Sequence, residues 1–119
     1  MRKLLLIAAC SAVATTAIAD PAQIVEIDAV ERGGAWQFSV TLLHEDTGWD
    51  DYADGWRIEA PDGTVLGTRE LLHPHVNEQP FTRSLSGVEV PEDLGEIVVR
   101  ARTNVDGWDD ATVSAELPR

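Results

Sequence analysis

Apolar and polar side chains alternate along most of the chain after residue 19, and this period of two residues constrains the fold more than any other feature. In residues 36–42, for example, Trp36, Phe38, Val40 and Leu42 alternate with Gln37, Ser39 and Thr41. Such a period is typical of a β-strand that buries one face and exposes the other. No apolar spacing typical of a helix is sustained for three turns, so the sequence predicts an all-β protein.

Seven segments have the character of strands, and turn residues separate several of them. The predicted strands are 22–31, 35–43, 55–60, 64–72, 80–86, 96–103 and 111–117. Turns rich in glycine, proline and acidic residues fall at 32–34, 61–63 and 91–95. About seven short strands within residues 20–119 predict a single domain, an antiparallel sandwich of immunoglobulin or fibronectin III type.

Residues 1–19 have the order of a secretory signal peptide: a cationic start, an apolar run and the small-residue site Ala17-Ile18-Ala19. We expect cleavage before Asp20 and export to the periplasm or the medium. The alternative uses Ile7-Ala8-Ala9-Cys10, which matches a lipoprotein box and would place a lipid anchor on Cys10. The apolar run is shorter than the ~20 residues of a membrane-spanning helix, and no later run is longer, so no span is expected.

The composition limits the classes of partner that the protein can bind and the reactive groups that it can offer. The formal net charge is −12, and Arg2 and Lys3 lie in the predicted signal peptide, so the predicted domain is more acidic still. Phosphate recognition needs a basic footprint, which disfavours nucleic acids and anionic membranes and leaves cations, small ligands and basic envelope proteins as partners. The single Cys precedes residue 20, so the domain has no thiolate ligand. No Gly-x-Ser-x-Gly or His-Glu-x-x-His motif is present, so we expect a binding protein rather than an enzyme.

The connections between the predicted strands alternate between the two ends of the sandwich. Segments 44–54, 73–79 and 104–110 therefore fall at one end. That end receives all three histidines together with Trp49, Tyr52 and Trp108. Because loops on a rigid sandwich are a common place for binding sites, we expect the function to lie there.

Three histidines in these loops predict a metal site. His73 and His75 flank a proline, and in an extended backbone their side chains point the same way. With His44 they would form a three-His site for Zn²⁺ or Cu²⁺, with Asp46 or Glu78 as a fourth or supporting group. The alternative is that all three are exposed loop histidines that bind nothing specific.

A four-residue sequence occurs twice at the same end, as Gly48-Trp49-Asp50-Asp51 and Gly107-Trp108-Asp109-Asp110. Exposed tryptophan rings beside carboxylates would bind a carbohydrate or a basic protein; the candidate residues are Trp49, Asp50, Asp51, Tyr52, Trp108 and Asp109. The alternative is that each of these two tryptophans folds over the open end of the sandwich as a plug. Trp36 and Trp56 occupy inward strand positions and are expected in the core.

Two longer motifs resemble those of a known group of proteins. The motif GWxxYADGW at 48–56 and the motif HPHVNEQPFTRSL at 73–85 resemble those of an uncharacterised family of small exported bacterial immunoglobulin-like proteins. The resemblance covers most of the chain after residue 19 and implies no activity. In that family a His often stands where this chain has Asp51, which implies that a metal site here is weaker or differently ligated.

The sequence therefore predicts an exported, periplasmic β-sandwich protein that binds copper or zinc through loop histidines at one end. The alternative is a non-enzymatic carbohydrate- or protein-binding module that uses the aromatic and acidic loops of the same end.

Overall fold

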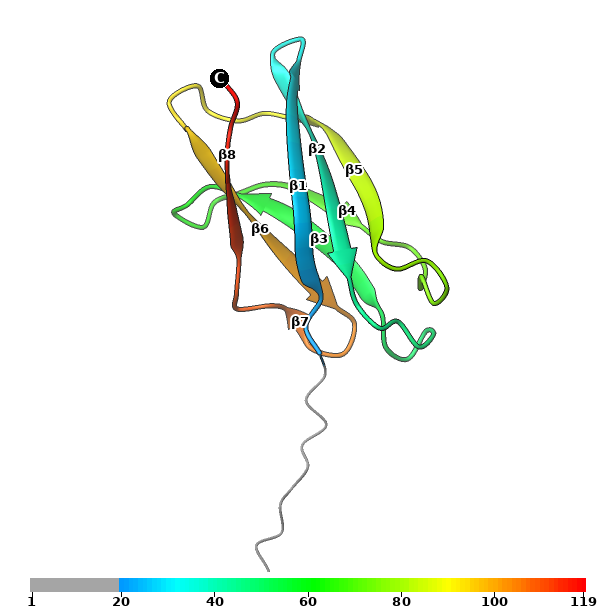
Figure 1. The fold of residues 1–119 in the computed structure, drawn as a ribbon. Coiled ribbons are helices and arrows are strands. Elements are labelled where there is room, and N and C mark those ends of the chain that lie inside the picture. Colours follow the sequence, from blue (N-terminus) through cyan, green and yellow to red (C-terminus); the bar gives the residue numbers. More distant parts are fainter. Residues whose placement is uncertain (1–19) are drawn as a thin grey trace, which may run out of the picture.

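Two antiparallel β-sheets pack face to face in the computed structural model, which describes residues 20–119 (Figure 1). The first sheet has the order β1 (Gln23–Arg32), β2 (Ala35–Leu43) and β5 (Phe81–Val88). The second has the order β4 (Val65–Glu70), β3 (Ala53–Glu59), β6 (Glu96–Thr103) and β7 (Gly107–Trp108), and β8 (Val113–Glu116) also pairs with β6. The predicted all-β sandwich is confirmed. The predicted signal peptide and Cys10 lie outside the described residues.

The strands lie close to their predicted positions, with one addition. β2 has its predicted bounds and so does β6, whereas β5 begins one residue later than predicted because Pro80 has no N–H to donate to the sheet. The addition is β7, which was predicted as part of a loop: Gly107 adopts φ +76°, and the chain turns back so that Trp108 pairs with Arg102. Within residues 20–119 no helix has the length and apolarity that crossing a bilayer requires.

The inward faces of both sheets form one hydrophobic core. Its largest fully buried side chains include Trp36 and Phe38 from β2, Trp56 and Ile58 from β3, and Ile97 from β6. Burial of each such side chain stabilises the fold by roughly 1.5–3 kcal/mol. The prediction that Trp36 and Trp56 are core residues is confirmed.

On the outer face of the second sheet, a buried carboxylate ties neighbouring strands together. Glu59 Oε2 accepts hydrogen bonds from Arg57 Nε at 2.6 Å and Arg100 Nε at 2.7 Å. The bonds from Arg100 hold the pKa of Glu59 below its usual value, against the opposing effect of burial. Arg100 also donates to the backbone carbonyls of Asp109 and Asp110, at 2.6 and 3.1 Å. The segment after β7 is thereby fixed against β6.

Three connections gather at one end of the sandwich, the lower end in Figure 1, as predicted. The side chain of Asn104 donates to the carbonyl of Trp49 and accepts from the N–H of Tyr52, both at 2.9 Å. The side-chain oxygen of Gln79 accepts from the N–H of His44 at 2.9 Å. These bonds join segments that are 35 to 55 residues apart in the chain.

Candidate metal and ligand site

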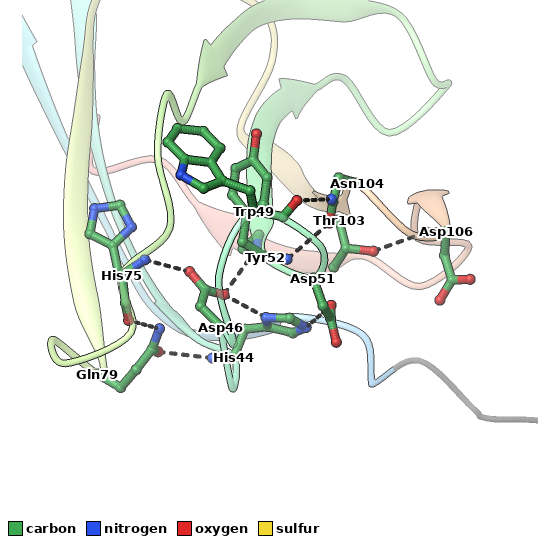
Figure 2. A network of polar contacts seen from close by, with 11 residues as sticks. His44, Asp46, Trp49, Asp51, Tyr52, His75, Gln79, Thr103, Asn104 and Asp106 are labelled. Carbon is green, nitrogen blue, oxygen red and sulfur yellow. Dashed lines mark hydrogen bonds and ion pairs between the residues drawn. The ribbon is translucent and has the colours of Figure 1, made fainter.

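The fully buried side chain of Asp46 is the centre of a polar network at this end (Figure 2). Asp46 Oδ1 accepts from His44 Nδ1 at 2.6 Å and from the N–H of Ala53 at 3.0 Å. Asp46 Oδ2 accepts from the N–H of His75 at 2.7 Å. One carboxylate therefore joins the 44–52 loop, the start of β3 and the 71–80 connection.

The imidazole of His44 lies between two carboxylates. Because an ionised carboxylate is only an acceptor, the bond to Asp46 places a proton on Nδ1 of His44. The other ring nitrogen, Nε2, lies 3.6 Å from Asp51 Oδ1, and the side chain of His44 is 1% exposed. Asp51 Oδ1 is buried and has no hydrogen-bond partner within the described part of the chain. If Nε2 is unprotonated, two sets of lone pairs face each other there, so the pair calls for a cation or a proton between them.

His75 belongs to a different set of side-chain contacts. Its ring stacks on Phe81, with centroids 3.9 Å apart, and its Nε2 accepts from the guanidinium of Arg83 at 2.8 Å. Burial, with a further contribution from Arg83, lowers the pKa of His75 below its usual value. Figure 2 shows the His75 ring turned away from His44. His75 thus reaches the network of Asp46 through its backbone and not through its imidazole.

The four predicted metal ligands are only partly brought together. His44 and Asp46 are in direct contact, whereas the exposed His73 packs beside His75 at 4.7 Å between ring centroids. Across residues 20–119, no group of three or more His, Cys, Asp or Glu side chains is arranged to hold a metal ion. The group opposite Nε2 of His44 is Asp51, which the sequence predicted as a ligand-binding residue and not as a metal ligand.

The aromatic ring of Trp49 is exposed to solvent at the tip of the 44–52 loop. Its side chain is 66% exposed, and its ring meets that of Tyr52 edge to face at 5.6 Å. The plug interpretation is therefore wrong for Trp49: the Gly48–Asp51 bridge closes the loop into a tight turn and turns the ring outward. Asp50, beside it, is also exposed.

Trp108 lies on the outer face of the second sheet rather than over the open end of the sandwich. The guanidinium carbon of Arg57 is 4.1 Å from the centre of its ring, and that of Arg102 is 5.8 Å away. The neighbouring Asp109 accepts from the N–H of Ala111 at 3.2 Å. The six predicted ligand-binding residues therefore form two groups, one in the 44–52 loop and one beside β7.

Comparisons with known proteins support the fold and leave the activity open. No protein-family model matches the chain. The chain is similar to a protein from Halomicrobium mukohataei described as "Putative lipoprotein", with 47% identity over 88 residues, 73% of this chain. The match is 43% of that relative, so the chain spans less than half of its length. The fold resembles the crystal structure of hypothetical protein PH1083 from Pyrococcus horikoshii OT3, with a TM-score of 0.53, 13% identity, and coverage of 82% of this chain and 89% of that one.

Proposed function

We propose that the protein is an exported β-sandwich module that binds a divalent transition metal, Cu²⁺ or Zn²⁺, between His44 Nε2 and Asp51. The observation that carries this proposal is the 3.6 Å approach of His44 Nε2 to a buried carboxylate oxygen without a hydrogen-bond partner in the described residues. A divalent cation placed there would be bound by both groups.

The hydrogen bond between His44 and Asp46 is of the kind that metal-bound histidines make. A metal-bound His usually donates its other ring nitrogen to a carboxylate, which fixes the orientation of the ring and raises its basicity. Asp46 does this for His44 at 2.6 Å, and its two further backbone bonds hold it in place. Imidazole and carboxylate together suit Zn²⁺ and Cu²⁺.

The site offers two protein donors, whereas closed structural zinc sites use four. Water or a partner molecule would complete the coordination, so the bound metal would remain exchangeable. This favours a role in capture or delivery of the metal over a permanent structural role. The formal net charge of −12 would raise the local concentration of cations around the molecule.

Export is supported by the predicted signal peptide and by the description of the relative from Halomicrobium mukohataei. We place the protein in the periplasm or outside the cell. Because the relative is described as a lipoprotein, it favours the alternative in which a lipid on Cys10 anchors the chain.

A second candidate function is the binding of a basic envelope protein at the 44–52 loop. The observation that favours it is the 66% exposed ring of Trp49, flanked by Asp50 and braced by Tyr52. Exposed tryptophans of this kind are typical anchors in protein interfaces.

The metal site is tested by calorimetric titration of the purified protein, without a His tag, with Zn²⁺ and with Cu²⁺. We expect one metal per chain, with affinity reduced roughly tenfold or more in Asp51→Asn, because the carboxylate is lost while the fold keeps its other contacts. His44→Gln should abolish binding. The matched control is His73→Gln, which removes an exposed imidazole and should leave the affinity unchanged.

A gain-of-function variant sharpens the test. Asp51→His supplies a second imidazole at the position opposite His44, and we expect tighter binding of Cu²⁺ than in the parent protein. Binding that survives both His44→Gln and Asp51→Asn but is lost when His73 and His75 are both replaced by alanine would overturn the proposed site. So would the absence of any binding in the parent protein and in Asp51→His.

A further inference from the structure

A groove of about 330 Å³ lies on the outer face of the second sheet, between the end of β4 and β7. Its floor includes Gly55, which pairs with Glu70 on one side and with Arg102 on the other. A Cβ at position 55 would lie 3.3 Å from the carbonyl oxygen of Arg69 and 3.9 Å from the ring of Trp108. The backbone of Gly55 has no positive φ that would demand glycine, so the missing side chain serves to keep this floor open.

Charged groups of both signs line the groove, and they are fixed in place. Arg69 faces the groove with its backbone carbonyl, because it pairs with the core residue Trp56 and its guanidinium donates to the carbonyl of Ser84 on the first sheet at 2.9 Å. Arg102 Nε lies 3.3 Å from Asp54 Oδ1, and that oxygen is buried with no hydrogen-bond partner in residues 20–119. With Glu70, the lining carries two carboxylates and the guanidinium group of Arg102. The groove therefore presents both donors and acceptors.

Aromatic rings complete the walls. Tyr52 stands on the side of the 44–52 loop and Trp108 on the side of β7. The ring of Trp108 is held by Arg57 at 4.1 Å, and the ring of Tyr52 is braced by Trp49 at 5.6 Å. Both side chains present an apolar body with one polar group, which suits a ligand that has apolar and hydroxylated parts.

We propose that this groove binds a short neutral saccharide. Hydroxyl groups are both donors and acceptors, so they can satisfy the carboxylates and the guanidinium group of Arg102 together, while the C–H face of a sugar ring packs on an aromatic wall. An apolar ligand would leave these charged groups desolvated and unpaired, which is costly. An anionic ligand would be repelled by a chain of net charge −12. The volume lies at the small end of the usual range for ligand pockets, about 300–1,000 Å³.

The inference is independent of the metal site, because the groove does not include His44 or Asp51. Its test is an amide NMR titration of the purified protein in EDTA with maltose, cellobiose and N,N′-diacetylchitobiose as probes. We expect saturable shifts for at least one probe at Gly55, Thr68 and the indole N–H of Trp108. Arg102→Met should weaken that binding roughly tenfold or more, because charged hydrogen bonds are lost.

The matched control is Arg32→Met, the same substitution at an exposed position outside the groove. It should leave the affinity unchanged. Gly55→Ala fills the floor and should weaken binding while the folded spectrum persists. The inference is overturned if none of the three probes shifts these signals at tens of millimolar, if Arg32→Met weakens binding as much as Arg102→Met, or if digalacturonic acid binds more tightly than all three neutral probes. Asp51→Asn should not affect saccharide binding, so a failure here is distinct from a failure of the metal site.

Discussion

The sequence Gly-Trp-Asp-Asp occurs at 48–51 and again at 107–110, and the two copies have different surroundings. In the first copy Trp49 is 66% exposed and touches Tyr52 at its edge. In the second copy the chain pairs with β6, and the ring of Trp108 packs under Arg57 at 4.1 Å. The carboxylates differ as well: Asp51 faces His44 at 3.6 Å, whereas Asp109 accepts from a neighbouring backbone N–H.

The difference comes from what each copy is attached to. The second copy is fixed by the outward side chains of two strands, through Arg57 on β3 and through Arg100 on β6. The first is fixed through loop contacts: Asn104 donates to the carbonyl of Trp49, and the N–H of Thr47 donates to the carbonyl of Asp51. The same four residues therefore form part of a rigid sheet face in one place and an accessible tip beside a polar cluster in the other. Accessibility makes the first copy the better candidate for contact with a partner.

Replacement of Asp46, which supports the loop of the first copy, should lower the free energy of unfolding more than any other change considered below. Asp46→Asn keeps the shape of the side chain but turns an NH₂ group toward a buried donor, so hydrogen bonds from His44, Ala53 and His75 are compromised. We expect the free energy of unfolding to fall by about 3 kcal/mol, measured by urea denaturation. Asp50→Asn, at an exposed position in the same loop, is the control and should change it by less than about 0.5 kcal/mol. Equal effects of the two variants would contradict the anchoring role of Asp46.

Replacement of the two tryptophans tests the comparison directly. Trp108→Ala removes a half-buried ring and its contact with Arg57, and we expect a loss of about 1–2 kcal/mol in the free energy of unfolding. Trp49→Ala removes a mostly exposed ring and should cost less than about 0.5 kcal/mol. Thermal or urea unfolding of the two variants side by side gives the answer. A larger loss for Trp49→Ala would mean that the first loop, and not β7, depends on its aromatic ring.

The smallest expected effect is a change in how the free energy of unfolding depends on pH near neutrality. Burial keeps the pKa of His75 below its usual value of 6.5, so the unfolded chain takes up a proton in that range before the folded chain does. The contribution of His75 to stability is therefore complete above pH 6.5 and is lost as the pH falls below it toward the folded pKa. His75→Phe, which preserves the stack on Phe81, should show a shallower decline in the free energy of unfolding between pH 7.5 and 5.5. An unchanged slope would contradict the assignment.

Most of the fold was predictable because the alternation of side chains is a local property of each strand. β2 and β6 illustrate this, since their bounds follow from the pattern alone. β7 was not predictable in the same way, because its pairing with β6 depends on how the chain turns at Gly107. The gathering of the three loops followed from the connections between strands. The residue that faces His44 could not be predicted in this way. The direction of Asp51 depends on the conformation of its loop, which hydrogen bonds from the distant residue Asn104 hold on either side of Asp51.

The shared acceptor at Asp46 also determines how the loop end moves. The amides of Ala53 and His75 both donate to this one side chain, although they are 22 residues apart in the sequence. Loss of either bond leaves a buried carboxylate oxygen short of a donor, which is costly, so we expect opening at one amide to loosen the other. Protection from hydrogen exchange should therefore be similar at the two amides, and both should open in one cooperative event that includes the imidazole of His44.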